Sequence, residues 1–372
     1  MNETVDLGAA EQPHVICTVR GAIGHVLLNR PKALNALTLD MIRIIDPQLA
    51  AWARDPAVKA VVIQGAGDRA FCAGGDVRAV WDSGKALQRG EGDGAVARDF
   101  FREEYRLNRR IKRYPKPYIA LLDGITMGGG VGLSVHGSHR VTTEKALLAM
   151  PETGIGLFPD VGGGYFLSRL PGELGTYLAL TGARLGAADA AYAGIATHHV
   201  PSAQLGALLE DLAAADYGAH AHAAVDAALA RHAAFPGEAP LAAHTPSIDR
   251  SFNAETVEEI LACLCDETQG FDDAWASATV KTLSQMSPTS LKVTLSQLRR
   301  GVSLEIEDVL VMEYRMTQAV MAGHDFYEGI RAQLVDKDRQ PKWRPATLAE
   351  VSESEVERHF QPVPSGDLAF TD

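Results

Sequence analysis

The sequence predicts an α/β fold, because short apolar strand patterns alternate with glycine-containing loops and helix patterns through its first two hundred residues. The clearest unit is an apolar stretch at 118–122, three consecutive glycines at 128–130 and a helix-like segment after them. The same order recurs more loosely over 141–168. After about Val200 the glycine loops cease and alanine-rich segments with helical apolar spacing follow, which predicts a helical half packed on the α/β core.

Local patterns place the first elements in order. Alternating apolar and polar residues at 15–19 and a resumed strand at 25–28 predict an opening hairpin. Thr38 is expected to cap a helix whose apolar residues recur at three- and four-residue steps as far as Trp52, and 58–64 reads as a strand. Further helices are expected at 96–111, 251–266 and 287–299, with a proline-rich linker at 235–246.

The composition excludes several classes of function. The 372 residues are 46% hydrophobic and 22% charged, which is ample for a large buried core. A net charge of −12 with scattered basic residues disfavours nucleic-acid binding. No apolar run approaches the roughly 20 residues of a membrane span, so no membrane partner is expected. The segment before Arg20 contains acidic and no basic residues, so we expect no signal or transit peptide and a cytoplasmic location.

The four cysteines indicate reduced thiols. Cys263 and Cys265 are too close in sequence for an ordinary disulfide, and no C-x-x-C pair is present. No cluster of side chains has the spacing of metal ligands, so no metal site is expected.

Two glycine turns are candidates for binding an anion or an oxyanion. One is the triplet at 128–130, and the other is Gly74-Gly75 in the loop at 71–76. Glycine lets backbone N–H groups approach a ligand closely, and two such donors from separate turns are what an oxyanion hole requires. Each turn taken alone is equally compatible with a packing role.

Three acidic residues are candidates for catalysis. Glu152 and Asp160 lie in an otherwise apolar loop shaped by glycine and proline, where desolvation raises the pKa of a carboxyl group. Helix capping by either residue is the structural alternative. Glu104 shares a helix face with apolar residues and is expected to point inward, with a salt bridge to an arginine as its alternative.

Several ordered motifs resemble those of the crotonase (enoyl-CoA hydratase/isomerase) superfamily, and most closely its 3-hydroxyisobutyryl-CoA hydrolase branch. The resemblance extends from about residue 14 to about residue 345. The segments that carry it are 28–37 (LNRPKALNAL), 71–76 (FCAGGD), 100–105 (FFREEY), 123–130 (DGITMGGG), 132–137 (GLSVHG), 150–165 (MPETGIGLFPDVGGGY) and 324–332 (HDFYEGIRA).

The resemblance implies a spiral of ββα turns at 14–205 that contains the thioester site, a helical region at 206–345 packed on it and a C-terminal tail at 346–372. It implies an oxyanion hole made by the N–H groups of Gly75 and Gly129. Coenzyme A would pass along two short stretches, which are Lys32, Ala33 and Leu34 in one loop and Ala73, Gly75 and Asp76 in the other.

The resemblance also separates two activities. Glu152 matches a catalytic acid of the hydratases, whereas Gly132 stands where their second glutamate would be. The hydrolase branch instead has acids at the positions of Asp160 and Glu104, which would bind the substrate together with Glu152 and Gly129.

The expected activity is therefore hydrolysis of 3-hydroxyisobutyryl-CoA, or of a similar short 3-hydroxyacyl-CoA, in valine breakdown. No cofactor is expected, since coenzyme A is part of the substrate, and a homo-oligomer is compatible with the family. The alternatives are an enoyl-CoA hydratase or isomerase on the same scaffold and a catalytically silent acyl-CoA-binding protein. Glu152 would act as a general base or as a nucleophile that forms an anhydride.

Overall fold

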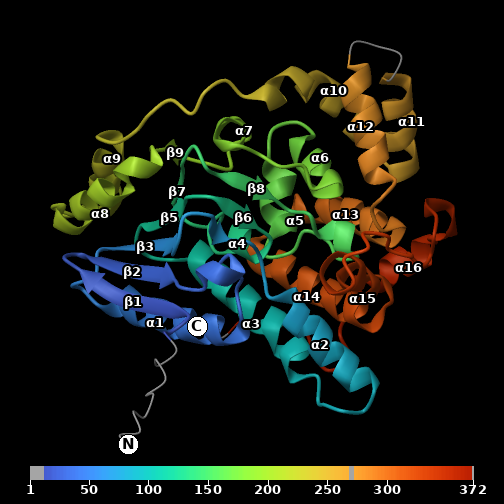
Figure 1. Cartoon of the computed structure of the whole chain (residues 1–372), viewed down its shortest axis with the longest axis horizontal. Coiled ribbons are helices and arrows are strands. Elements are labelled where there is room, and N and C mark those ends of the chain that lie inside the picture. The colour runs from blue at the N-terminus through green and yellow to red at the C-terminus, as the bar shows by residue number, and fades with distance from the viewer. Residues whose placement is uncertain (1–11, 268–271, 371–372) are drawn as a thin grey trace, which may run out of the picture.

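The structure, a computed structural model, describes residues 12–267 and 272–370. Two sheets form the centre of its first half (Figure 1). The six-stranded sheet contains, in spatial order, β1 (Val15–Arg20), β2 (Ile23–Leu28), β3 (Ala60–Gly65), β5 (Tyr118–Leu122), β7 (His139–Thr142) and β9 (His198–His199). The three-stranded sheet contains β4 (Ala70–Cys72), β6 (Ile125–Met127) and β8 (Leu147–Ala149).

From β3 onward the strands alternate between the two sheets along the chain. β1 and β2 form the predicted antiparallel hairpin, and every other strand pair is parallel. β3, β5 and β7 enter the larger sheet, and each is followed by a strand of the smaller sheet. The chain therefore winds as a spiral in which each turn supplies one strand to each sheet, and this confirms the predicted α/β spiral.

The helices of the first half lie between and beside these turns. The cap of the first helix is as predicted, because the Thr38 side chain accepts a hydrogen bond from the Met41 amide at 3.2 Å. The helices are α1 (Leu39–Arg54), α2 (Val77–Gln88), α3 (Ala95–Lys112), α4 (Gly129–Gly132), α5 (Gly163–Phe166), α6 (Leu174–Thr181) and α7 (Ala187–Tyr192).

The second half is helical, as expected. Its helices are α8 (Leu205–Ala214), α9 (Ala221–Ala230), α10 (Thr245–Phe252), α11 (Val257–Glu267), α12 (Asp273–Leu283), α13 (Pro288–Gly301), α14 (Ile306–Ala322), α15 (Asp325–Ile330) and α16 (Glu353–Arg358). The single-turn segments of the whole chain are η1 (Pro31–Ala33), η2 (Glu152–Ile155), η3 (Leu167–Arg169), η4 (Ser202–Gln204), η5 (Pro240–His244), η6 (Arg331–Val335) and η7 (Leu348–Glu350).

One predicted helix is divided in two. The expected helix at 251–266 is interrupted between α10 and α11. The Thr256 hydroxyl accepts from the Glu259 amide at 3.2 Å, and the Glu259 carboxylate accepts from the Thr256 amide at 3.0 Å. This reciprocal pair satisfies free amides at a helix start, so a new helix begins there.

The helical half covers the α/β core on two sides. Apolar side chains of α8 and α9, among them Leu208 and Val225, pack with Val62 and Ile119 of the larger sheet. α13 and α14 instead lie beside α5 and α3 (Figure 1). Their apolar side chains belong to the main apolar cluster. Residues 233–239 lead from α9 to η5 without regular structure, whereas 240–246 of the predicted linker belong to η5 and to the start of α10.

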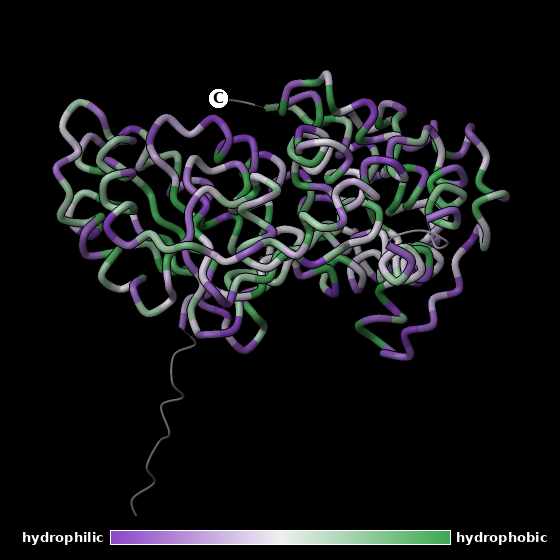
Figure 2. Tube along the Cα trace, turned by 90° about the horizontal axis from the view of Figure 1, so that it is seen from above, coloured by the Kyte–Doolittle hydropathy of each residue, from purple (hydrophilic) through white to green (hydrophobic). Residues whose placement is uncertain are grey.

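The tail after residue 345 packs on the same body. Phe360 and Leu368 are buried in the main apolar cluster, and Asp367 forms an ion pair with Arg315 at 2.6 Å. Figure 2 shows hydrophobic segments running through the interior of the chain, with hydrophilic residues along many outer loops. Within 12–267 and 272–370, no helix combines the length and apolar character needed to cross a membrane.

Candidate active site

The smaller sheet brings three loops to one edge. β4, β6 and β8 are parallel neighbours, so their carboxyl ends meet at the same side of the sheet. Gly75 follows β4, Gly129 follows β6 and Glu152 follows β8, each within three residues of the end of its strand. Residues that are distant in sequence are thereby placed around one small cavity of about 90 Å³.

The two glycine turns face one another across this cavity. A Cβ atom added to Gly129 would lie 3.1 Å from the Gly75 nitrogen. Among the described residues, no backbone hydrogen bond uses the Gly75 amide. Gly129 is the first residue of α4, and the amide of a first helical residue has no acceptor within its helix. Both amides are therefore available to a ligand oxygen, as an oxyanion hole requires.

Three buried carboxyl groups line the same cavity. Glu104, Glu152 and Asp160 are 2%, 5% and 4% exposed, respectively. A Cβ atom on Gly129 would lie 2.6 Å from Oε1 of Glu104, and one on Gly128 would lie 2.8 Å from Oε1 of Glu152. The acids thus adjoin the glycine turns directly. The structure brings together all three acids that the sequence singled out.

Burial governs the protonation of these acids. It raises the pKa of Glu104 well above its ordinary value, and the nearby Asp160 and Glu152 raise it further. Burial likewise raises the pKa of Glu152, with a second contribution from Asp160. The pKa of Asp160 rises from 3.8 to about 7 through burial, although a hydrogen bond from Tyr105 lowers it. A carboxyl group with a pKa of about 7, such as that of Asp160, can exchange protons near neutral pH.

The structural alternatives for these acids are not observed. Asp160 does not cap α5, because that helix begins at Gly163 and the Asp160 carboxylate accepts from the Tyr105 hydroxyl instead. Glu152 is not the N-cap of η2 either, because Pro151 occupies that position. Among the described residues, Oε1 of Glu104 has no hydrogen-bond partner, and no ion pair joins Glu104 to an arginine.

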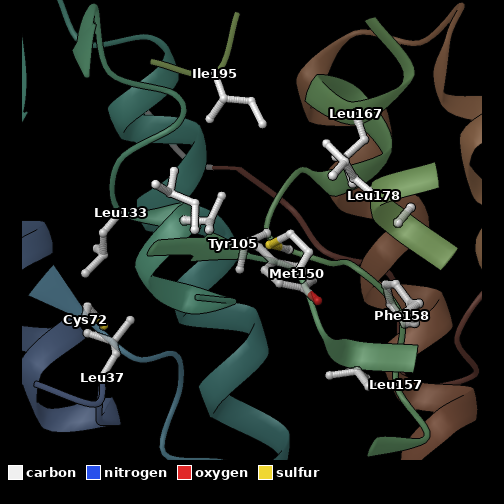
Figure 3. Packing of buried hydrophobic residues seen from close by; sticks show 14 of the residues in the cluster. Leu37, Cys72, Tyr105, Leu133, Met150, Leu157, Phe158, Leu167, Leu178 and Ile195 are labelled. Carbon is white, nitrogen blue, oxygen red and sulfur yellow. The ribbon is translucent and has the colours of Figure 1, made fainter. Parts of the chain in front are cut away.

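Tyr105 is a site residue that the sequence reading missed. Its hydroxyl donates to Oδ2 of Asp160 at 2.8 Å. Figure 3 shows its side chain among buried apolar residues near Met150. The sequence pattern of an aromatic residue next to Glu104 on a buried helix predicts only core packing. The hydrogen bond to Asp160 becomes apparent only in the folded structure.

The position of the missing hydratase acid is closed by packing. A Cβ atom on Gly132 would lie 2.7 Å from Cβ of Val161 and 2.8 Å from Nδ2 of Asn108. Both neighbours are fully buried. A glutamate at position 132 would therefore not fit without displacing them.

The residues expected along coenzyme A form the outer side of the site. Lys32 and Ala33 lie in η1 and are exposed, while the Leu34 carbonyl accepts from the Ala73 amide at 3.0 Å. This bond places the two stretches side by side. The Asp76 side chain serves the fold as well, since it caps α2 and pairs with Arg30 at 3.3 Å.

Comparisons with known proteins agree with this geometry. A family model described as enoyl-CoA hydratase/isomerase matches residues 23–360. A mitochondrial 3-hydroxyisobutyryl-CoA hydrolase of Xenopus laevis is 53% identical over 95% of this chain and 90% of its own. The protein of the same name from Homo sapiens is 51% identical over 97% of this chain and 92% of its own. Because these relatives are named mitochondrial, the cytoplasmic location expected from the sequence is wrong.

Two solved structures share the fold over nearly the whole chain. A carnitinyl-CoA dehydratase from Mycobacterium thermoresistibile is 46% identical with a TM-score of 0.87, covering 96% of this chain and 99% of its own. An enoyl-CoA hydratase from Rhodobacter sphaeroides is 41% identical with a TM-score of 0.85, covering 96% and 100%. The chain therefore belongs to the enoyl-CoA hydratase/isomerase family, the crotonase superfamily that its glycine turns and its Glu152 loop resemble.

Proposed function

We propose that this protein hydrolyses 3-hydroxyisobutyryl-CoA to 3-hydroxyisobutyrate and coenzyme A, as a step in valine breakdown. The observation that carries the proposal is the convergence of three buried carboxyl groups on two glycine amides that are free to bind an oxyanion. Relatives that share about half of the sequence are named for this hydrolysis, which supports the assignment.

The thioester carbonyl oxygen would lie between the amides of Gly75 and Gly129. These donors stabilise the negative charge that develops on the oxygen when the carbonyl carbon is attacked, and losing one such donor typically costs about 10²–10³ in rate. Because the donors are backbone groups, their positions depend on the turns that follow β4 and β6.

Glu152 supplies the attack in either of two ways. As a general base it takes a proton from water while the water oxygen adds to the carbonyl carbon. The C–S bond then breaks, and the departing thiolate takes that proton from Glu152 to give coenzyme A. As a nucleophile it forms a mixed anhydride with release of coenzyme A, and water then hydrolyses the anhydride. Both routes involve the Glu152 carboxylate and the thioester carbonyl, and both give the free acid and coenzyme A. Neither requires a metal or a redox cofactor.

Asp160 and Glu104 would bind the 3-hydroxyl group and orient the water. The cavity is small and lined by Phe100, Phe101 and Leu157 besides the acids, which favours a short acyl chain. A buried carboxylate left without a donor is costly, so a substrate hydroxyl that donates to it gains affinity in proportion.

An enoyl-CoA hydratase is the second candidate, because the two similar solved structures are named as a dehydratase and a hydratase. Hydration in this family is expected to use a pair of glutamates, and the space for the second one is occupied at Gly132. A catalytically silent acyl-CoA-binding protein is disfavoured because Glu152 and both glycine turns are present.

The deciding experiment measures thiol release over a panel of acyl-CoA esters, together with loss of the enoyl absorbance of crotonyl-CoA. We expect 3-hydroxyisobutyryl-CoA to be the best substrate in the panel and crotonyl-CoA to be consumed far more slowly. Consumption of crotonyl-CoA at a comparable rate would favour the hydratase. Binding of the esters without turnover of any would favour the silent member.

A further inference from the structure

Two polar side chains of the helical half are buried against the loop that carries Asp160, and the catalytic scheme above gives them no part. Glu313 lies on α14 and Gln297 on α13, and both are 0% exposed. No ion pair among the described residues includes Glu313. A carboxyl group buried without a cation needs hydrogen-bond donors to remain there.

The loop at Asp160 supplies these donors. Glu313 accepts from the backbone amides of Gly162 at 2.7 Å and Gly164 at 2.9 Å. The Gln297 side-chain nitrogen donates to the Pro159 carbonyl at 2.8 Å and to Glu313 at 2.9 Å. Gln297 and Glu313 therefore hydrogen-bond to the backbone before and after Asp160, respectively.

The fastened segment contains an unfavourable backbone conformation. Val161, the residue after Asp160, has a φ of +52°. The left-handed region is sparsely populated by residues other than glycine and is a genuine outlier for a β-branched side chain. Such conformations persist only where the surroundings hold them, and they concentrate at functional sites. His136 also restrains this residue, through a 2.7 Å hydrogen bond between its Nε2 and the Val161 carbonyl.

The electrostatics agree with a fixed geometry. Burial raises the pKa of Glu313 to about 8, while the amides of Gly162 and Gly164 lower it and Asp160 raises it. The hydrogen bonds to Glu313 thus stabilise the loop backbone, although burial of the carboxyl group is itself unfavourable. A solely apolar contact at this position would pack α14 equally well but would not direct the Asp160 peptide.

We propose that Glu313 and Gln297 are positioning residues that hold the strained turn at Val161 and thereby aim Asp160 at the 3-hydroxyl of the substrate. The inference rests on the proposed function. It assigns to the helical half a part in substrate discrimination, exerted through the backbone of the loop and without contact with the substrate.

The test compares Glu313→Gln with wild type on 3-hydroxyisobutyryl-CoA and isobutyryl-CoA. Glutamine keeps the size of the side chain, but its NH2 group faces one of the two loop amides, so one hydrogen bond is lost. The ratio of kcat/KM for the two esters is the readout, because a smaller amount of folded enzyme lowers both values equally. We expect the ratio to fall about tenfold or more, as misplacement of a binding group by a fraction of an ångström does.

Thr317→Val is the matched control. Thr317 is fully buried one turn along α14, and its hydroxyl bonds to the Tyr314 carbonyl of the same helix. Its ratio should remain that of wild type. In an Asp160→Ala background, Glu313→Gln should leave the ratio unchanged, because its effect passes through Asp160. If Glu313→Gln does not fold, Gln297→Met, which removes the bonds to Pro159 and Glu313, takes its place.

An unchanged ratio in folded Glu313→Gln would overturn the inference, as would an equal fall in the Thr317→Val control. If wild type released no thiol from 3-hydroxyisobutyryl-CoA, the proposed function would fail separately. Whether Glu313 restrains the loop would then be measured by hydrogen exchange of the Gly162 and Gly164 amides. Faster exchange in Glu313→Gln than in Thr317→Val supports the hold, and equal exchange refutes it.

Discussion

The Tyr105 hydroxyl donates a 2.8 Å hydrogen bond to Oδ2 of Asp160, and this bond lowers the pKa of a carboxyl group that burial raises to about 7. One carboxylate oxygen of Asp160 thereby has a fixed donor. The other remains for a second donor, which we propose is the hydroxyl of the substrate.

Tyr105→Phe should move the pH dependence of the enzyme upward. Without the donor, the ionised form of Asp160 loses support and its pKa rises, so the ascending limb of kcat/KM for 3-hydroxyisobutyryl-CoA should shift by about one pH unit or more. Tyr118→Phe is the control, because Tyr118 is equally buried and its hydroxyl donates to the Leu133 carbonyl. A shift of the same size in both variants would contradict the assignment.

Glu152→Gln should lower turnover by about 10²-fold or more while KM changes little, since the amide fills the same space but neither takes a proton nor attacks a carbonyl. Steady-state thiol release measures both constants. Glu103→Gln is a suitable control, because Glu103 lies on α3 but faces Arg43 at the surface, 2.6 Å away. Near-parental turnover in Glu152→Gln would show that the chemistry lies elsewhere.

Asp160→Ala should reduce the preference for a hydroxylated substrate. In wild type we expect isobutyryl-CoA to be a much poorer substrate than 3-hydroxyisobutyryl-CoA, because an unpaired buried carboxylate costs about 1–3 kcal/mol or more. The variant should lose activity mainly on the hydroxylated ester. An equal loss on both esters would instead make Asp160 part of the thioester chemistry.

The free energy of unfolding should fall as the pH rises from about 6.5 to 8, above the range in which buried histidines such as His136, whose pKa burial lowers from 6.5, affect it in the opposite sense. Burial raises the native-state pKa of Asp160 from 3.8 to about 7 and that of Glu313 from 4.5 to about 8, so the native state binds more protons than the unfolded state in this window. Their contribution to stability is complete below the ordinary pKa values and is lost as the pH rises through the raised ones.

Urea denaturation at several pH values measures this slope, and Asp160→Asn should reduce it. Glu307→Gln should not, because hydrogen bonds from Arg113, chief among the causes, lower the pKa of Glu307 to about 2 and keep it ionised throughout the window. A flat profile for the wild type would contradict the raised pKa values.

Gly132→Ala should destabilise the protein by about 1–3 kcal/mol, because the added methyl group would lie 2.7 Å from Cβ of Val161 in a packed interior. Gly206→Ala, within α8, meets no atom within 4 Å and should be neutral or stabilising. Thermal or urea denaturation distinguishes the two. Equal effects of the two substitutions would mean that the packing at Gly132 yields readily.

Local sequence patterns were sufficient for part of this site. The helical spacing around Glu104 indicates which side of α3 faces inward. The turns after β4 and β6 can be recognised because they contain consecutive glycines. The contact between Tyr105 and Asp160 joins residues 55 positions apart, and no local pattern encodes it. The contact of Glu313 with Gly162 spans 151 positions and depends on how α14 packs, which only the complete fold determines.

The interrupted helix at 251–266 had a local signal that apolar spacing alone does not show. Thr256 and Glu259 have the three-residue separation of a capping pair, which starts a helix even inside a periodic apolar pattern. The Glu152 and Asp160 loop could be recognised as acidic and apolar, but its strained Val161 could not, since backbone conformation there is imposed by distant side chains.

In the three-stranded sheet, consecutive turns of the spiral each contribute a different group to the site. The loop after β4 brings one amide, the loop after β6 brings another, and the loop after β8 brings the acid. Each loop is anchored by its own strand, so a residue can be exchanged in one loop while the others keep their places. The same scaffold can thus keep both amide donors for a thioester oxygen while the positions of its acids change, and Gly132, packed against Val161 and Asn108, leaves no room for an acid at one such position.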